Sequence, residues 1–232
     1  MEEPFNWSGT YANWESLSRS GMLRRSCSLQ QMMRPGSQFN LTDMLSALRT
    51  HHCNDEWTEG MHCVCMHARN LVLPTDLDCQ TTNSMIAVMK PVDPMILSPG
   101  MSTPCIAPFQ PFWFDAWSDR QVFAYDRQEQ AMASWLHREQ LNRAAIDGRL
   151  PLEEYRWEMH AMERAWLAQA QSVAREDRQE LVDQNAAEAE AFFEKWIAIA
   201  DRNAALPRGD EGFRAWWAEK NAALGKDRRI AY

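Results

Sequence analysis

Long apolar runs and a basic N-terminal segment are both lacking from this sequence of 232 residues. No stretch approaches the ~20 apolar residues that a helix needs to cross a bilayer. The first residues, MEEPFNW, are acidic where a secretory signal peptide would be basic and then apolar. We therefore expect a soluble protein that is not exported, that resides in the cytoplasm and that has no membrane partner.

An excess of positive charge is lacking as well. The chain has 24 Lys and Arg residues against 32 Asp and Glu, which gives a net charge of -8 at pH 7. Such a protein repels phosphate backbones unless a local basic stripe compensates. The nearest candidate stripe consists of Arg19, Arg24, Arg25 and Arg34, and a solvated or ion-paired helix face explains these arginines more simply. We expect no nucleic-acid partner.

Glycine is scarce, and the nine glycines are scattered along the chain. No glycine-rich phosphate loop occurs, and neither does the nucleophile elbow that presents a catalytic serine in many hydrolases. We find no internal repeat beyond helical periodicity. We therefore expect no cofactor.

Cysteine, by contrast, is present six times, at Cys27, Cys53, Cys63, Cys65, Cys79 and Cys105. A chain of this length with 45% hydrophobic residues can bury a substantial core and does not need a disulfide scaffold. We expect reduced thiols.

The first part of the chain mixes predicted helices and strands. A short helix over 23–33 ends at the Pro35-Gly36 turn, and a second helix begins after the capping residue Asn40 and ends near His51. Alternating patterns predict strands over 62–67, 84–89 and 121–125. The proline-rich segment 91–111 indicates a loop with a short edge strand.

After Asp126 the composition shifts to Ala, Glu, Gln, Arg and Trp, which predicts helices as far as the C-terminus. The first covers 128–146 and ends at the Asp147-Gly148 turn, and the second has Pro151 at its first position. The second carries the most regular apolar stripe, from Leu152 to Val173, with spacings of three and four residues. Two further helices contain Phe192 with Trp196, and Phe213 with Trp216 and Trp217. We place the domain boundary between residues 126 and 127.

Metal binding is one chemical alternative for the central segment. In an extended strand, Cys63, Cys65 and His67 share one face, and together with a fourth ligand they match tetrahedral zinc by residue type. The fourth ligand would come from His51, His52 or Cys53. The single residue between the two cysteines differs from the wider spacing of structural zinc sites, and cysteine is commonly a core residue. We therefore predict buried strand packing and no metal.

Nucleophilic catalysis is a second alternative, through Cys65 with His67 or Cys53 with His52. A reactive thiolate needs a base close in space, and adjacency in the sequence does not establish that proximity. Hydroxyls of the run 81–84 would line a pocket or, more simply, cap a turn.

One ordered set of short segments runs along the chain: Arg24-Arg25, Leu41-Thr42-Asp43-Met44-Leu45 with Leu48-Arg49, Cys65-Met66-His67-Ala68, Gln80-Thr81-Thr82 with Ser84-Met85, Thr103-Pro104-Cys105 with Phe109 and Pro111, and Ser134-Trp135-Leu136-His137-Arg138-Glu139-Gln140-Leu141-Asn142-Arg143. These segments resemble the C-terminal part of secernins and related cysteine dipeptidases of the N-terminal-nucleophile (Ntn) hydrolase superfamily. Together they cover nearly the whole chain.

The resemblance implies an α+β fold, namely the C-terminal part of an αββα sandwich: a partial Ntn-like core over 1–126 and a long-helix region over 127–232 packed on it. It also implies hydrolysis of dipeptides or similar small amides by an N-terminal cysteine whose own α-amino group acts as the base. This sequence starts with Met1, and its first cysteine, Cys27, falls in a predicted helix. We expect the nucleophile to lie outside this chain and the chain to be inactive alone, which leaves open whether it is an enzyme.

Three interpretations follow from the resemblance. The chain is an incomplete Ntn hydrolase, or a non-catalytic subunit completed by a separate N-terminal half, or a helical interaction module that binds a partner or a second copy through the stripe from Leu152 to Val173. No residue is predicted to be catalytic. Arg24 and Arg25 are the predicted substrate-binding residues, for a small peptide or amide, although either would equally suit a surface ion pair.

Overall fold

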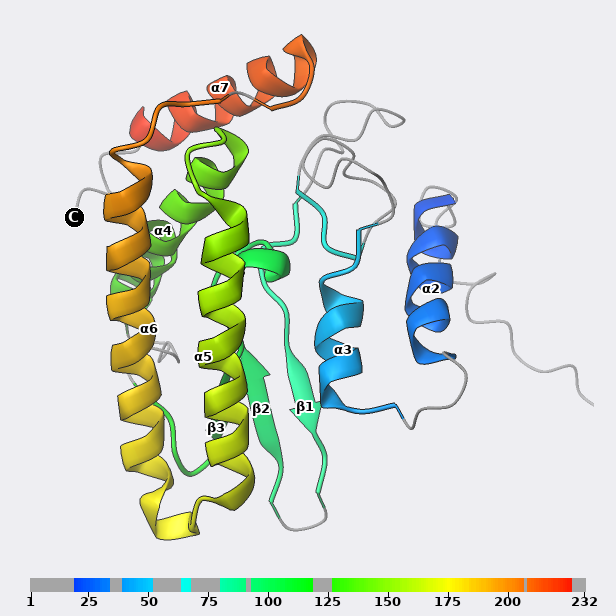
Figure 1. Cartoon of the computed structure of the whole chain (residues 1–232), viewed down its shortest axis with the longest axis vertical. Helices are drawn as coiled ribbons and strands as arrows, with labels where there is room; N and C mark the ends of the chain where they lie inside the picture. The colour runs from blue at the N-terminus through cyan, green and yellow to red at the C-terminus, as the bar shows by residue number, and fades with distance from the viewer. Residues whose placement is uncertain are drawn as a thin grey trace, which may run out of the picture. The chain divides into compact units, whose positions relative to one another are not determined.

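The computed structural model describes residues 19–33, 39–51, 64–67, 80–90, 93–118, 127–206 and 208–226, and it shows an α+β protein (Figure 1). The chain divides into two compact units, residues 1–79 and 80–232. The domain boundary predicted after residue 126 falls at the end of 119–126, which lies outside the described residues, as does the strand predicted over 121–125.

The first unit contains two helices that pack on each other, α2 (Arg19–Met32) and α3 (Leu41–Leu48). A capping box starts α3: the Asn40 side chain accepts hydrogen bonds from the backbone N–H groups of Thr42 and Asp43, and the Asp43 carboxylate accepts one from the Asn40 N–H. Leu45 and Ala47 provide the buried face of α3. Both helices predicted for this part of the chain are confirmed, although α2 begins four residues earlier than predicted.

The strand predicted over 62–67 is wrong in its described part. Val64 and Cys65 form a bend, and Met66 and His67 have no regular structure, while His62 and Cys63 lie outside the described residues. The Cys65 N–H donates to the Thr50 carbonyl at 3.3 Å, just after α3. That bond belongs to a bend, whereas a strand needs a ladder of bonds to a neighbour.

The second unit is built on a three-stranded antiparallel sheet in the order β1-β2-β3 (Figure 1). The strands are β1 (Ile86–Val88), β2 (Met95–Ser98) and β3 (Gln110–Trp113). The predicted strand over 84–89 is confirmed at its centre. The prediction for 91–111, a loop with one short edge strand, is corrected: the segment contains the central strand β2 as well as the start of the edge strand β3. Pro94 and Pro99 flank β2 and leave its backbone N–H groups free to pair.

The register gives the sheet two different faces. Leu97 lies opposite Ile86 and Pro111, and Met95 lies opposite Trp113, and all five side chains are buried. On the other face Ile96 lies between Ala87 and Phe112, where Ala87 is exposed and the other two are half-buried. Met89 and Phe114, just beyond the strand ends, are 79% and 74% exposed. The second face therefore presents apolar side chains at the surface.

Four long helices complete the second unit: α4 (Gln128–Ile146), α5 (Leu152–Ser172), α6 (Arg178–Ala200) and α7 (Glu211–Lys226), with short 3-10 turns η2 (Pro104–Ile106) and η4 (Arg175–Asp177). The predicted helical half is confirmed, with the bounds of α4 as predicted. Helix α5 begins at Leu152, so Pro151 is its N-cap and not, as predicted, its first residue. No helix in the described part of the chain is long and apolar enough to span a membrane.

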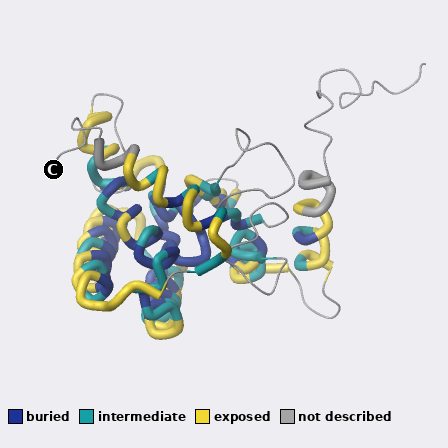
Figure 2. Tube along the Cα trace, turned by 90° about the horizontal axis from the view of Figure 1, so that it is seen from above, coloured by how far each residue is buried: buried dark blue, intermediate teal, exposed yellow. Residues whose placement is uncertain are grey.

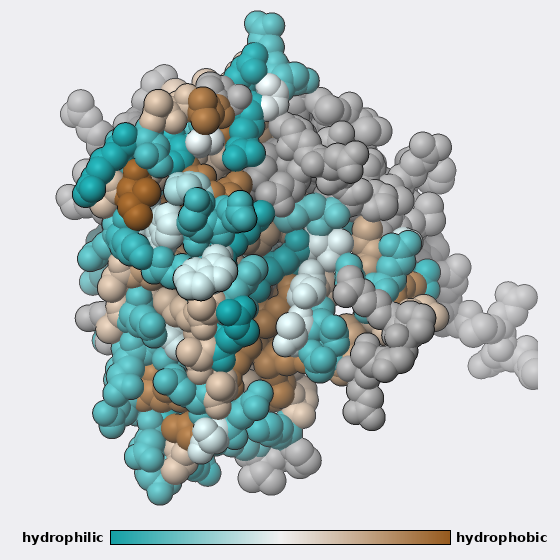
Figure 3. Space-filling view, viewed as in Figure 1, coloured by the Kyte–Doolittle hydropathy of each residue, from teal (hydrophilic) through white to brown (hydrophobic). Residues whose placement is uncertain are grey.

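Helices α5 and α6 run side by side over one face of the sheet (Figure 1), and both contact β3. The α5 stripe supplies the fully buried Tyr155, Met159 and Trp166, and the Tyr155 ring packs on Phe192 and Trp196 of α6. This stripe therefore packs within the unit. Figure 2 shows the buried residues concentrated between the elements, and Figure 3 shows a mostly hydrophilic outer surface over α5 and α6.

Candidate functional site

A buried polar network surrounds the carboxylate of Glu139 on α4, which is only 1% exposed. One carboxylate oxygen accepts a short hydrogen bond from the Ser102 hydroxyl. The other accepts from the Asn142 amide at 2.9 Å and the Gln80 amide at 3.3 Å, and it pairs with Arg143 Nε at 3.1 Å. We call these residues, with Thr103, the Glu139 network.

The backbone beside this network is strained. Thr103 has a φ of 62°, in the left-handed region that a β-branched residue rarely adopts. Three contacts hold it there: its N–H donates to the Thr81 carbonyl at 2.9 Å, its hydroxyl donates to Asn142 Oδ1 at 2.8 Å, and the hydroxyl oxygen lies 3.5 Å from Ser102 Oγ. Such strain persists only where the surroundings impose it. The network thus fixes the loop between β2 and η2 against α4.

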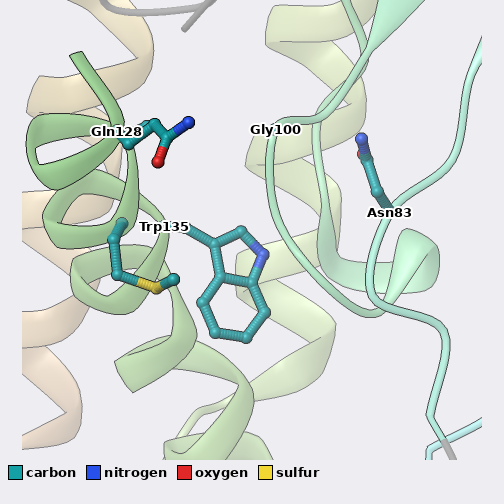
Figure 4. A pocket seen from close by; sticks show the side chains of 6 residues that line it. Asn83, Gly100, Gln128 and Trp135 are labelled. Atoms are coloured by element: carbon teal, nitrogen blue, oxygen red, sulfur yellow. The ribbon is translucent and has the colours of Figure 1, made fainter. Parts of the chain in front are cut away.

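The same loop forms one wall of a cavity of about 530 Å³. Gly100 lies on that wall, and Arg138 Nη1 approaches so closely that an added Cβ at Gly100 would meet it at 2.6 Å. Gln128 and Trp135 project from α4 toward the loop, and Asn83 lies on the opposite side (Figure 4). Ala131 and Met132 complete the lining.

The cavity and the network have different chemical roles. Both Glu139 oxygens accept hydrogen bonds from protein donors, and the carboxylate is inaccessible, so it positions its neighbours and does not face a substrate. The cavity combines an indole and a thioether with the carboxamides of Asn83 and Gln128. Carboxamides donate and accept hydrogen bonds, as peptide and amide groups do. This cavity therefore suits a small ligand with amide groups, and its volume lies in the usual range for small-molecule sites.

The buried Arg138 and the half-buried Arg143 support the surroundings of the network. Arg138 donates to Glu190 on α6 at 2.5 Å and to the Gly100 carbonyl at 3.3 Å, which ties α4 to α6 and to the loop. Arg143 lies 4.3 Å from the centroid of the Trp217 ring on α7. Burial lowers the pKa of the Arg143 guanidinium, and the neighbouring Glu139 carboxylate opposes that shift.

The residues considered for zinc or thiol chemistry are brought together only in part. Cys65 Sγ lies 3.1 Å from His67 Nε2, and His51 Nε2 lies 3.2 Å from the same His67 atom. Cys63, His52 and Cys53 lie outside the described residues. The thiol and the imidazole of the Cys65–His67 pair are thus close enough for proton transfer, but they are 1% and 2% exposed, so this thiol does not face a substrate.

The predicted substrate-binding arginines lie in the first unit. Arg24 and Arg25 are both exposed on α2. Arg25 contributes to a surface hollow of about 420 Å³ that is also lined by Ser26, Leu29, Gln30 and Met33. Their role in binding substrate stays a prediction. Cys27, two positions further along α2, is buried.

Sequence reasoning did not single out Glu139 or Asn142 as site residues, although a signal was present. Leu136, Glu139 and Asn142 recur at intervals of three, which places them on one face of α4, and Leu136 on that face is buried. A charged residue on a buried face requires partners. No pattern in the sequence indicates that those partners are Ser102 and Gln80, because they come from loops far along the chain.

No protein-family model, curated protein or solved structure matches this chain. The fold and the site define an α+β protein with a helix-covered antiparallel sheet and a mostly apolar cavity between α4 and the loop that follows β2.

Proposed function

We propose that this chain is the C-terminal portion of a secernin-like Ntn hydrolase that acts on small peptides or amides, and that it is inactive without an N-terminal half that carries the nucleophile. One observation carries the proposal. Three of the segments on which the resemblance rests, 80–85, 103–111 and 134–143, meet at the Glu139 network, through Gln80, Thr103 and Glu139.

The architecture of the second unit agrees with this proposal. In an αββα sandwich each sheet has helices on one face and the other sheet on the opposite face. The sheet here carries α5 and α6 on one face and exposes Ala87, Met89 and Phe114 on or near the other. A second sheet supplied by an N-terminal half would cover those side chains.

The chemistry of the described cysteines also agrees with it. An Ntn nucleophile needs its thiol and a free α-amino group on one residue. Cys27 lies inside α2, Cys65 in a bend and Cys105 in η2, and all three are buried. None of these three described cysteines is therefore placed to act as the nucleophile, and the reaction would require one from elsewhere.

The experiment is to express the chain alone and together with the product of the coding region immediately upstream, and to measure amino-acid release from a panel of dipeptides. We expect release only from the combined proteins, with the mature upstream product starting at a cysteine when its N-terminal residues are sequenced. Alkylation of that cysteine should abolish release. Turnover by the chain alone, or an upstream product with no N-terminal cysteine, would contradict the proposal.

A further inference from the structure

The geometry around His67 points to a second site, and we propose that His51, Cys65 and His67 bind a zinc ion. All three ligand atoms lie within 4.8 Å of one another. The centroids of the two imidazole rings are 4.7 Å apart, whereas their Nε2 atoms are only 3.2 Å apart, so the Nε2 corners point inward. Both residues thus present the same ring nitrogen to one point, beside the thiol.

Hydrogen bonding alone does not account for these contacts. An imidazole nitrogen has one in-plane position, which holds either a proton or a lone pair. His67 Nε2 nevertheless has two close polar neighbours, Cys65 Sγ at 3.1 Å and His51 Nε2 at 3.2 Å. The one in-plane position of His67 Nε2 can form a good hydrogen bond to only one of these two neighbours. A cation in the middle satisfies all three atoms, because each then directs a lone pair at the ion.

Two of the three separations between ligand atoms can be compared with those of tetrahedral zinc. With Zn–N bonds of about 2.0–2.1 Å, two nitrogen ligands stand about 3.3 Å apart, close to the 3.2 Å between the two Nε2 atoms. A nitrogen and a sulfur ligand stand about 3.6 Å apart in such a site, so the 3.1 Å separation of Cys65 Sγ and His67 Nε2 has to widen by about half an ångström. That adjustment is within reach of side-chain rotation.

The ligand types restrict the metal. A thiolate with two imidazoles suits zinc, and it also suits copper, whereas magnesium and calcium take oxygen ligands. Burial favours an ion over a catalytic thiol here, because Cys65 and His67 are 1% and 2% exposed and an ion needs far less access than a substrate.

The bend at Val64 and Cys65 lets two ligands that are only two residues apart meet. In an extended strand, side chains two residues apart are separated by about two rises of 3.3 Å, too far for direct contact. The bend brings Cys65 Sγ and His67 Nε2 to 3.1 Å instead. His51, sixteen positions before His67, approaches from the end of α3, beside the backbone bond from Cys65 to Thr50. Zinc would therefore fasten this segment to α3.

The test is to strip the full-length chain with a chelator, reload it with zinc and measure bound metal by mass spectrometry and affinity by competition with a chromogenic chelator. We expect one zinc per chain. Cys65→Ser and His67→Gln should each weaken binding by more than about 100-fold, because loss of an outer-shell partner alone costs 10–100-fold. The matched controls Cys27→Ser and His137→Gln should bind as the wild type does.

Cobalt gives a readout that does not depend on whether the variants fold. The wild-type chain loaded with Co²⁺ should show tetrahedral d–d bands and a sulfur-to-cobalt charge-transfer band. Less than about a tenth of an equivalent of zinc after reloading, or a cobalt spectrum without the sulfur band, would overturn the site. So would a folded Cys65→Ser chain with wild-type zinc affinity. None of these three results would bear on hydrolytic activity, because the proposed function assigns the nucleophile to a separate half of the enzyme.

Discussion

At the scale of single residues, Arg178 connects three parts of the second unit. Its guanidinium donates two hydrogen bonds to Asp93, just before β2, and lies 4.7 Å from the centroid of the Trp113 ring on β3. Asp115, two residues after the end of β3, lies 3.8 Å from the same guanidinium. The hydrogen bonds from Arg178 lower the pKa of the Asp93 carboxyl, and burial opposes that shift. The start of α6 is thereby held against the sheet.

This ion pair predicts a specific pH dependence. Because the folded pKa of Asp93 lies below the unfolded value of about 3.9, the carboxylate stabilises the fold above that pH and stops doing so as pH falls through the folded pKa. Asp93→Asn should therefore lower the melting temperature at neutral pH, and its difference from the wild type should shrink below about pH 4.

Thermal unfolding recorded from neutral to acidic pH provides the measurement. Asp183→Asn is the control, since Asp183 is exposed and accepts a hydrogen bond only from the neutral Gln179 among the contacts described for it. If the melting temperatures of both variants differ from that of the wild type by a constant amount across the acid range, Asp93 does not contribute in this way.

At the scale of elements, α4 ends in a Schellman motif. The Arg149 N–H donates to the Ala144 carbonyl at 2.8 Å, and the Gly148 N–H donates to the Ala145 carbonyl at 3.1 Å. Gly148 has a φ of 72°, and an added Cβ would lie 2.2 Å from the Leu206 carbonyl oxygen. That carbonyl belongs to backbone which is itself bonded to α4, since the Leu206 N–H donates to the Asp147 carbonyl. Position 148 requires glycine, because other residues rarely adopt this φ and because a Cβ has no room beside the Leu206 carbonyl.

Gly148→Ala should therefore destabilise the protein by at least about 3 kcal/mol, since the left-handed conformation alone costs roughly 1–2 kcal/mol and displacement of backbone adds to it. Urea unfolding measures the change. Gly209→Ala, at a glycine with the same φ of 72°, serves as the conformational control and should cost less. Equal losses at the two positions would show that the contact with Leu206 contributes nothing.

Some elements could be predicted from local sequence signals and others could not, and the difference has a physical cause. The bounds of α4 and the cap of α3 follow from local signals, namely the Asp147-Gly148 turn and the pair Asn40 and Asp43. Strand β2 is only four residues long, and its stability comes from pairing with β1 and β3, which no local pattern encodes. The bend at Cys65 likewise depends on a bond to Thr50.

At the scale of the whole molecule, the candidate sites show the same limit of prediction from local sequence patterns. The sequence offered Cys65, His67 and His51 as possible ligands, but only the bend shows that they converge. Glu139 stands on a recognisable buried face of α4, whereas its partner Ser102 comes from a strained loop 37 residues earlier. Chemistry that depends on residues from distant segments cannot be predicted from local periodicity.

The exposed face of the sheet allows a test of the proposed architecture. Ala87 is exposed on β1, opposite Ile96. If a second sheet covers this face in the complete enzyme, a charge at position 87 is harmless in the isolated chain and is buried in the assembly. Ala87→Glu should therefore change the unfolding free energy of the chain alone by less than about 0.5 kcal/mol. In the complex, burial of an unpaired charge should abolish both co-purification with the upstream product and dipeptide hydrolysis.

The matched control for Ala87→Glu is Ala191→Glu, which places the same charge at an exposed position of α6, in the helical layer on the opposite side of the sheet. Sheets that pack face to face are separated by only about 10 Å, so a glutamate on the covered face has no route to water, whereas one on the outer helical layer keeps its hydration. We expect Ala191→Glu to co-purify and to hydrolyse dipeptides as the wild type does. Assembly of Ala87→Glu at the wild-type level would show that no second sheet covers this face.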